Sequence, residues 1–456
     1  MVRVYIKVGM ILLVALLLLV PLGMIASVVD DRSHYRDQVI REIERTWSGE
    51  QIVTGPVLKL PYLVDLTERI TNPATGKLES RVRREHRMHY LIAETLHLES
   101  TAQTEMRTIG IYSVPVYTSH HDMRATFAFS SLETIENTEH FVRWGSPTLS
   151  LMVSDGRGIS GEPVLNWNGQ TQSLQAGSEM PNNPPGLHAN VIWPQQAQTV
   201  DVSMTLTLRG SQSLYFSPLA HHFNASLQSG WPHPKFDGQF LPASRTVSDE
   251  GFSGVWDVSS FATNAQTQIN GCFRESRCAA HQLPRLGVTF FEPVDIYTKV
   301  TRAIKYGVLF IAITFVAFFL TETLTRARLH PMQYVLVGLS LAIFYLLLVS
   351  LSEHMPFRHA YVMATVSSVT LIGVYLSGAL GHRRLAFLYS VGMGLLYAML
   401  FTILRSEDFA LLMGTILLFG LLAAVMLLTR RIDWYEFGRG KRGATTPDSD
   451  VRLPGH

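Results

Sequence analysis

The sequence contains an uncharged apolar stretch, VGMILLVALLLLVPLGMIASVV, at Val8–Val29. A helix rises ~1.5 Å per residue, so this stretch can cross a hydrocarbon core of ~30 Å. It is longer than the ~7–15 apolar residues of a secretory signal peptide. We therefore interpret it as an uncleaved membrane anchor, with a cleaved signal as the alternative.

Five further apolar stretches follow Lys305, and ionisable residues bracket each of them. They lie at Tyr306–Thr321, Met332–Ser352, Ala360–Leu380, Leu385–Leu404 and Phe409–Thr429. A soluble helix bundle is the competing interpretation, but five successive segments of this length favour membrane helices. The sequence therefore predicts six transmembrane helices.

The long segment between the first and second predicted helices has no apolar stretch of membrane length. The predicted fold is a membrane α-helical bundle of six transmembrane helices, with a large, mostly β extracytoplasmic domain inserted between helices 1 and 2. The expected boundaries are an N-terminal segment 1–7, helix 1 at 8–29, the polar domain at 30–303, a five-helix bundle at 304–429 and a basic, disordered tail at 430–456.

The basic residues beside the spans predict the orientation, because cytoplasmic loops carry an excess of Lys and Arg. The residues that fall on one side are Arg3, Lys7, Arg326, Arg328, Arg383, Arg384, Arg430, Arg431, Arg439, Lys441 and Arg442. The opposite hairpins hold only Arg358 and Arg405. This predicts a multi-pass membrane protein with both termini cytoplasmic and the large domain on the outer side, which in a bacterium is the periplasmic side of the cell inner membrane.

The overall charge argues against a nucleic-acid partner. The formal net charge is +2, and no Lys/Arg stripe with interleaved aromatic residues occurs. The expected partners are the lipid bilayer and an envelope protein or wall-associated ligand. The sequence does not indicate an oligomeric state.

The second predicted span is unusually short. Only 16 residues separate Lys305 from Glu322, about 24 Å of helix. We expect these two residues at the membrane interfaces, either snorkelling or paired with neighbouring helices. A functional role is the alternative, and the candidate functional ionisable residues are Lys305, Glu322, Glu353 and Asp408.

Small residues predict how the fourth and fifth spans pack. Gly373, Ser377 and Gly381 recur every four residues, as do Ser390, Gly394 and Ala398, and such seams allow close approach of helices in lipid. No span has an acidic or basic residue at its centre, and no span is expected to be broken by proline. Both features count against a proton-coupled or broken-helix transporter.

The polar domain begins with a helical pattern and continues with strand patterns. Tyr35, Val39, Ile43 and Trp47 recur every four residues, which predicts a one-faced stalk helix at Ser33–Trp47. This helix either continues the membrane helix or lies on the bilayer. The alternation in Val202–Leu208 predicts a half-buried strand. Frequent Gly/Pro turns then favour a sandwich or a barrel, without a choice between them.

The search for chemistry finds no catalytic signature and predicts no cofactor or metal. GxSxG, HExxH, P-loop and CxxC motifs are absent from the sequence. Cys272 and Cys278 are a possible disulfide, and two unpaired thiols are the alternative. We therefore expect a protein that is not an enzyme.

Three polar motifs have both a functional and a structural interpretation. His120-His121 and His221-His222 are possible metal ligands, but adjacent strand residues point to opposite faces, which favours ordinary surface histidines. Asp155-Gly-Arg-Gly158 is a turn or an anion-binding nest, and we favour the turn. Arg405-Ser-Glu-Asp408 is either a partner-binding hairpin or an interface anchor.

Several runs together resemble the CreD family of bacterial inner-membrane proteins, in order and over nearly the whole chain up to Phe437. In the membrane part they are Phe291–Phe310, Thr314-Phe315, Glu322, His330–Tyr334, Phe344–Leu348, Ser350–His354, Ser406–Leu412 and Thr429–Tyr435. In the polar domain they are Gly55-Pro56, Pro61-Tyr62, Gly110–Tyr117, Gly210-Ser211, Ser229–Phe236, Gly238 and Leu241-Pro242.

This resemblance implies a role in cell-envelope integrity and in the stress response controlled by the CreBC two-component system, including β-lactam and colicin tolerance. It supplies no catalytic residue or ligand. We therefore expect a non-catalytic protein with a periplasmic interaction domain. The alternatives are a transporter or channel lined by Thr365, Ser367, Ser368 and Thr370, and a membrane enzyme using Glu322, Glu353 or Asp408.

Overall fold

A computed structural model describes residues 2–71, 78–193, 199–274, 283–290, 296–325, 330–379, 383–405 and 410–430. The chain divides into two compact units. We call Met1–Tyr35 with Val294–His456 the helical unit, and Arg36–Pro293 the β domain. The β domain covers nearly the same residues as the predicted polar domain.

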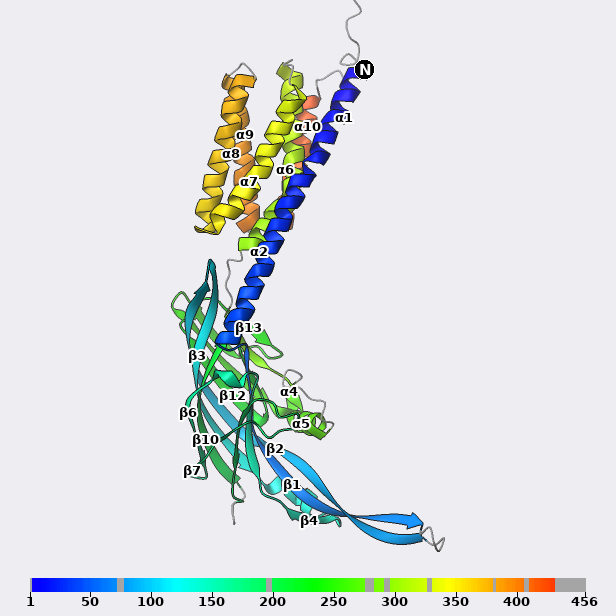
Figure 1. Cartoon of the computed structure of the whole chain (residues 1–456), viewed down its shortest axis with the longest axis vertical. Coiled ribbons are helices and arrows are strands. Elements are labelled where there is room, and N and C mark those ends of the chain that lie inside the picture. The colour runs from blue at the N-terminus through cyan, green and yellow to red at the C-terminus, as the bar shows by residue number, and fades with distance from the viewer. Residues whose placement is uncertain are drawn as a thin grey trace, which may run out of the picture. The chain divides into compact units, whose positions relative to one another are not determined.

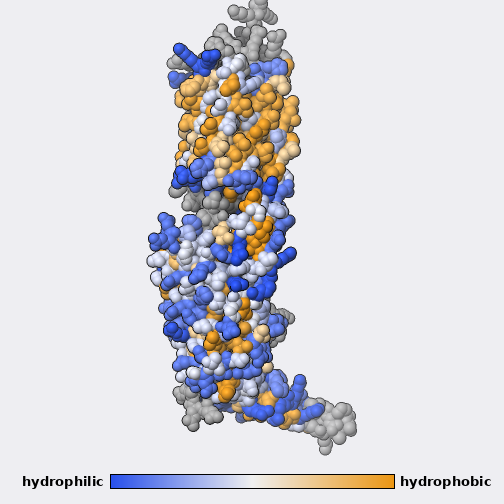
Figure 2. Space-filling view, turned by 60° about the vertical axis from the view of Figure 1, so that its left-hand side comes forward, coloured by the Kyte–Doolittle hydropathy of each residue, from blue (hydrophilic) through white to orange (hydrophobic). Residues whose placement is uncertain are grey.

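The helical unit consists of long helices that run alongside one another (Figure 1). They are α1 (Val2–Leu17), the start of α2 (Leu19–Thr46), α6 (Ile296–Thr325), α7 (Pro331–Ser352), α8 (Phe357–Ala379), α9 (Arg383–Arg405) and α10 (Ala410–Thr429). Their outer surface carries a broad apolar belt, with hydrophilic residues at its two ends (Figure 2). Such a belt suits hydrocarbon contact.

Five helices in the described part of the chain are long and apolar enough to cross a membrane. They are Ile6–Thr46, Ile296–Phe319, Pro331–Ser352, Phe357–Gly378 and Arg383–Arg405. The sixth predicted span coincides with α10. A membrane helix bundle with an inserted β domain is therefore the fold of this chain.

The second span is not short, contrary to expectation. Helix α6 has 30 residues, and its apolar segment starts at Ile296, well before Lys305. The reason is that Tyr297, Val300 and Ala303 are buried on one face of the helix, so packing extends the helix beyond the continuous apolar run. Lys305 lies inside α6 and is exposed.

The first span is interrupted, which corrects the expectation that no span is broken. Helix α1 ends at Leu17 and α2 begins at Leu19, four and two residues before Pro21. Proline has no N–H to donate to the carbonyl four residues earlier, and its ring crowds that carbonyl. The Leu22 amide still donates to the Leu18 carbonyl, over a long 3.4 Å.

The strands of the β domain form one extended sheet of 16 strands in the described residues. They are β1 (Gln51–Thr71), β2 (Leu78–Ile109), β3 (Tyr112–Ala128), β4 (Phe141–Trp144), β5 (Thr148–Val153), β6 (Ile159–Trp167), β7 (Gln170–Gln172), β8 (Gln175–Ala176), β9 (Gly186–Asn190), β10 (Thr199–Ser211), β11 (Ser213–Ser217), β12 (Ala220–Ser229), β13 (Pro234–Gly238), β14 (Ser244–Ser248), β15 (Gly251–Ser259) and β16 (Leu286–Phe290).

Strand β2 joins the two halves of this sheet. Its first part pairs with β1 up to Val57↔Ile92, and its second part pairs with β3 from Thr95↔Thr126 onward. The distal parts of β1 and β2 form a two-stranded arm that extends beyond the other strands (Figure 1). The sequence leaves open a sandwich or a barrel, and the structure shows a single sheet whose two halves are joined through β2.

The core of the β domain follows from strand alternation. Strand β10 alternates exposed and buried residues along its length, as predicted for Val202–Leu208. The main cluster includes Trp256, Phe127 and Leu208, all fully buried. Helix α5 (Ala265–Arg274) covers a second cluster on β1 and β2. Short helical segments complete the domain: η1 (Ser130–Leu132), α3 (Glu133–Glu136), η2 (Gly156–Gly158) and α4 (Ser260–Thr263).

Candidate functional site

Helix α2 contains the predicted stalk and continues directly from the first membrane span, so the alternative of a separate surface helix is wrong. Val39 and Ile43 are each 3% exposed and lie on its buried face. Its last carbonyls have no intrahelical partner, as at every helix end. The β domain supplies those partners.

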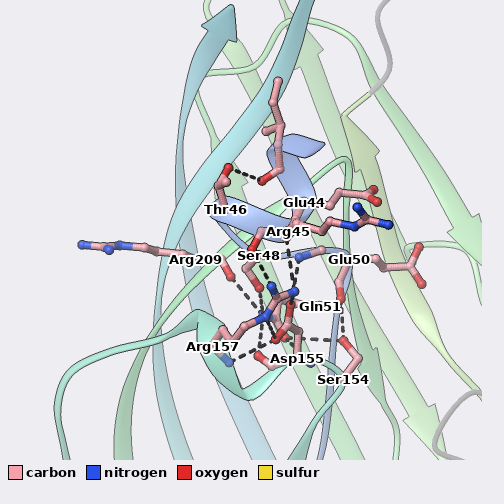
Figure 3. A network of polar contacts seen from close by, with 12 residues as sticks. Glu44, Arg45, Thr46, Ser48, Glu50, Gln51, Ser154, Asp155, Arg157 and Arg209 are labelled. Carbon is pink, nitrogen blue, oxygen red and sulfur yellow. Dashed lines mark hydrogen bonds and ion pairs between the residues drawn. The ribbon is translucent and has the colours of Figure 1, made fainter. Parts of the chain in front are cut away.

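Arg157 caps the C-terminal end of α2. Its guanidinium donates through Nη1 to the Arg45 carbonyl at 2.5 Å and through Nη2 to the Glu44 carbonyl at 3.2 Å (Figure 3). A cation at this position also interacts favourably with the partial negative charge at a helix C-terminus. Arg157 lies in η2, in the middle of the Asp155–Gly158 motif, which forms a turn as expected.

Asp155 holds this guanidinium in place. Its carboxylate accepts Arg157 Nε at 3.0 Å and Nη2 at 2.6 Å, and it also accepts the Gly49 amide at 3.1 Å (Figure 3). Burial raises the pKa of Asp155, but these hydrogen bonds outweigh burial and lower the pKa to about 2. The carboxylate is therefore fully charged near neutral pH.

Gln51 ties the first residues of β1 to the same network. Its Nε2 lies 2.9 Å from Ser48 Oγ, 2.9 Å from the Asp155 carbonyl and 3.0 Å from the Arg209 carbonyl (Figure 3). A Cβ at position 158 would overlap Gln51 Nε2 and the Arg209 carbonyl. Glycine is required there, and we call Arg157, Asp155, Gln51 and Gly158 the clamp.

Trp47, the last residue of the stalk pattern, is held by two cations. The guanidinium of Arg107 lies 4.4 Å from the centroid of its ring, and that of Arg209 lies 4.9 Å away. Such cation–π contacts contribute about 0.5–1 kcal/mol each at exposed sites and more when desolvated. The end of α2 is thus fixed by the clamp and by this stack.

The helical unit holds the first span at both ends by ion pairs. Near the N-terminus Lys7 Nζ pairs with Glu322 Oε1, and the Tyr334 hydroxyl donates to Glu322 Oε2 at 3.0 Å. Glu322 is only 9% exposed. A carboxylate in this setting needs cationic and hydrogen-bonding partners. The expectation that Glu322 pairs with neighbouring helices is confirmed.

The other end of the span uses Glu353, which caps α7. Arg32 Nε lies 3.6 Å from Glu353 Oε1, and the Tyr297 hydroxyl donates to the same oxygen at 3.1 Å. The first span therefore forms an ion pair with a different helix near each of its ends. The start of the first span meets the end of α6, while Arg32 meets the end of α7.

Between the two ion pairs, leucines of the first span fit against glycines. A Cβ at Gly338 of α7 would overlap Leu18, and a Cβ at Gly307 of α6 would lie 2.9 Å from Leu22 Cδ2. Small residues permit this close approach of helices in lipid. In the predicted seam of spans four and five, a Cβ at Gly373 would lie 2.5 Å from Ser390 Oγ, whereas a Cβ at Gly394 would have open space within 4 Å.

The four polar residues proposed to line a transport path do not share a face. Ser367 and Thr370 are exposed on the outside of α8. Ser368 is buried and lies 3.2 Å from the Tyr397 hydroxyl, and Thr365 is partly buried beside it on the helix. Adjacent residues on a helix point about 100° apart, so Ser367 and Ser368 face different directions and the four residues do not line one face of α8.

The remaining predicted residues take other positions. Lys305 is exposed on α6, and Asp408 lies outside the described residues. Cys272 lies in α5 and is disulfide-bonded, but Cys278 lies outside the described residues, so their pairing stays a prediction. Among the described residues, no group of three or more His, Cys, Asp and Glu side chains is placed to hold a metal ion.

His120 and His121 of β3 point to opposite faces of the sheet, as strand geometry requires. His120 is exposed, whereas His121 is 1% exposed and lies 2.8 Å from both Ser100 Oγ and Ser119 Oγ. Burial lowers the pKa of His121 to about 3, with a smaller contribution from His120. His121 is therefore a neutral core residue, which corrects its interpretation as a surface histidine.

Some residues of these sites are missed from the sequence. Lys7 is identified there only as a topological charge and Arg157 only as part of a turn, and neither Arg32 nor Gln51 is singled out. The available signal was position: Lys7 and Arg32 flank the first span, so they are spaced to reach the two ends of its neighbours.

Replacing Asp155 with Asn should weaken the β domain in a pH-dependent way. The folded-state pKa of about 2 lies below the usual Asp value of 3.8, so the charged carboxylate stabilises the fold above pH ~4, by about 1 kcal/mol once solvent screening of this partly exposed group is allowed for. That contribution is lost as the pH falls from ~4 to ~2. Thermal unfolding of the wild type and of Asp155→Asn should differ at pH 7 and converge near pH 2. A difference that persists at pH 2 would contradict this assignment.

Removing Lys7 should destabilise the helical unit more than removing both members of its pair. Lys7→Ala leaves Glu322 without its ammonium partner, and losing one member of a buried pair costs about 3–5 kcal/mol. In Lys7→Ala/Glu322→Gln the neutral amide needs no counter-ion. We expect thermal midpoints in detergent to rank Lys7→Ala lowest, with the exposed Lys305→Ala control unchanged. Equal losses in the single and double variants would show that Glu322 does not need the cation, and an unchanged midpoint in Lys7→Ala would rule out a stabilising role for this pair.

Comparison with known proteins gives a consistent result over the chain. A family model described as Inner membrane protein CreD matches residues 3–435. Inner membrane protein CreD of Escherichia coli (strain K12) is 36% identical over 444 residues, which cover 96% of each chain.

Matches to solved structures are remote. An M1 zinc metallopeptidase from Deinococcus radiodurans is 11% identical, with a TM-score of 0.20, covering 37% of this chain and 40% of that one. Native leukotriene A4 hydrolase from Saccharomyces cerevisiae is 10% identical, with a TM-score of 0.21, covering 42% and 28%. Similarity this low supports no inference about fold or activity.

Proposed function

The chain belongs to the CreD family of inner membrane proteins, and we propose that it is a non-catalytic envelope-integrity protein whose β domain binds an envelope partner outside the cytoplasm. One observation carries the proposal. Helix α2 begins in the helical unit, where Arg32 meets Glu353, and ends in the β domain, where Arg157 caps it. A domain on a passive tether would not need both fixations.

The proposed orientation combines the charge bias with the ion pairs. Lys7, Glu322 and Tyr334 gather at one end of the bundle, and Arg32, Tyr297 and Glu353 gather at the other. The first group lies beside the basic N-terminal segment, and the basic bias favours placing that end in the cytoplasm. The β domain, which follows Arg32, then lies in the periplasm.

A cysteine-labelling experiment tests this orientation. Val247→Cys in β14 and Lys441→Cys in the tail are each treated with a membrane-impermeant maleimide in cells with a permeabilised outer membrane. We expect labelling of Val247→Cys in intact spheroplasts and of Lys441→Cys only after lysis, because the inner membrane excludes the reagent. The reverse pattern would invert the proposed topology.

The β domain offers a groove for a partner at the base of its arm. It has a volume of about 730 Å³ and lies between Pro61–Leu63, His86, residues 143–147 and residues 191–193. Its rim combines Ile192, which is 70% exposed, with the exposed basic side chain of Arg143. A concave surface with apolar and polar contacts is the usual form of a binding site.

The function and the groove can be tested separately in a strain that lacks the chromosomal gene. Envelope permeability to a fluorescent dye is measured with the full chain, with a chain lacking residues 50–290, with Ile192→Asp and with the matched control Val247→Asp. We expect the deletion and Ile192→Asp to leave the envelope leaky, because a buried charge blocks partner contact, while Val247→Asp restores the barrier.

The outcomes separate the two claims. If the chain lacking residues 50–290 restored the barrier, the proposed role of the β domain would be wrong. If Ile192→Asp restored the barrier while the chain lacking residues 50–290 did not, the partner would bind elsewhere on the β domain. Membrane fractionation of each variant controls for insertion.

A further inference from the structure

The first membrane helix is the least enclosed of five long apolar helices, which are this helix, α6, α7, α8 and α9. Only 22% of its most apolar stretch is buried, against 33% for α8 and α9, 50% for α6 and 56% for α7. Its buried side chains form one narrow line along a single face of the helix, at Val14, Leu18, Leu22, Ile25 and Val29.

The other helices have a core that does not need it. Phe310 of α6, Phe344 of α7, Tyr361 of α8 and Tyr397 of α9 each contribute one ring. The Phe344 and Tyr397 centroids are 4.5 Å apart, those of Phe344 and Tyr361 are 5.6 Å apart, and those of Phe310 and Tyr397 are 6.3 Å apart. The stretch Val8–Val29 contains no aromatic residue. Moving the first helix would leave this aromatic core intact.

The helix is interrupted beside its contact with Gly338 of α7. Leu18, the residue between α1 and α2, fills the notch at Gly338, and Pro21 removes a hydrogen bond one turn later. Sharp bends in helices occur at prolines, and hinges are short segments that absorb backbone rotation. The middle of the first span therefore combines a potential hinge at Leu18–Pro21 with close packing of the Leu18 side chain against Gly338.

We propose that the first helix is a conformational switch that leaves and re-enters the Gly338 notch, bending between Leu18 and Pro21. This inference rests on the proposed function, because the signal is partner binding to the β domain, which is connected through α2. Docking is discrete, since a leucine is either in the notch or out of it. The Lys7–Glu322 pair favours the docked state when no partner is bound, because undocking would separate a buried carboxylate from its cation.

A reversible cross-link tests whether undocking is required. A Cβ at position 338 lies 3.3 Å from Leu18 Cγ, the position that a cysteine sulfur at residue 18 would occupy. Leu18→Cys/Gly338→Cys therefore locks the docked state on oxidation. The matched control is Gly373→Cys/Ser390→Cys, which links α8 to α9 within the part of the bundle that is not expected to move.

We expect oxidised Leu18→Cys/Gly338→Cys to raise dye permeability to within about twofold of the deletion strain, and a membrane-permeant phosphine to restore the barrier. The control should retain function in both states, as should each single variant. A locked chain that keeps full function would overturn the switch. A full chain that fails to restore the barrier in the first place would instead refute the proposed function.

A second measurement needs no phenotype. Spin labels at Leu13 of α1 and Ile343 of α7, both lipid-exposed, report the distance between the helices in nanodiscs by double electron–electron resonance. The switch predicts two distance populations, with the longer one suppressed at least fivefold by the Leu18→Cys/Gly338→Cys disulfide. A single population that is unchanged by the disulfide would also overturn the proposal.

Discussion

The capping of α2 by Arg157 is the interaction on which the connection between helix and β domain depends. Terminal carbonyls of a helix must find donors, and here the donor is a side chain whose direction is set by Asp155. The same turn requires glycine at position 158, because Gln51 occupies the space of a side chain. Chain segments that are distant in sequence therefore meet at one polar centre, and none can shift alone.

The bilayer imposes the complementary constraint on the helical unit. Carboxylates at the margin of hydrocarbon need a cation and a hydrogen-bond donor, and Glu322 and Glu353 each have both. In each case the cation comes from the first helix and the hydroxyl from a tyrosine on another helix. Ion pairs thus fix the ends of the first helix, while glycine notches accommodate its middle.

The sequence predicts which faces of helices and strands are buried, but it does not predict which side chains pair between segments that are distant along the chain. The alternation in Val202–Leu208 and the four-residue spacing of Val39, Ile43 and Trp47 report which face is buried, so they gave the strand and the stalk. The length of α6 was misjudged because Tyr297–Ile304 is apolar on only one face. A hydropathy run misses such a face, whereas a periodicity test would detect it.

The candidate site lay beyond sequence reasoning for a different reason. Arg157 and the end of α2 are separated by more than a hundred residues, and Lys7 and Glu322 by 315. Pairing at such distances is decided by topology, which one sequence does not encode as a local pattern. Pro21 was visible in the sequence, but its consequence depends on the notch at Gly338, which only the packing reveals.

The two ends of α2 are held by different kinds of contact. In the β domain the helix end is fixed by charge-assisted bonds, a buried glutamine and a cation–π stack. In the helical unit the first span is fixed by ion pairs near its two ends and by a line of buried apolar side chains between them, at Val14, Leu18, Leu22, Ile25 and Val29. Pro21 lies inside that line and has no N–H to donate to the preceding turn. The proposed switch therefore bends at Leu18–Pro21 rather than at the clamp.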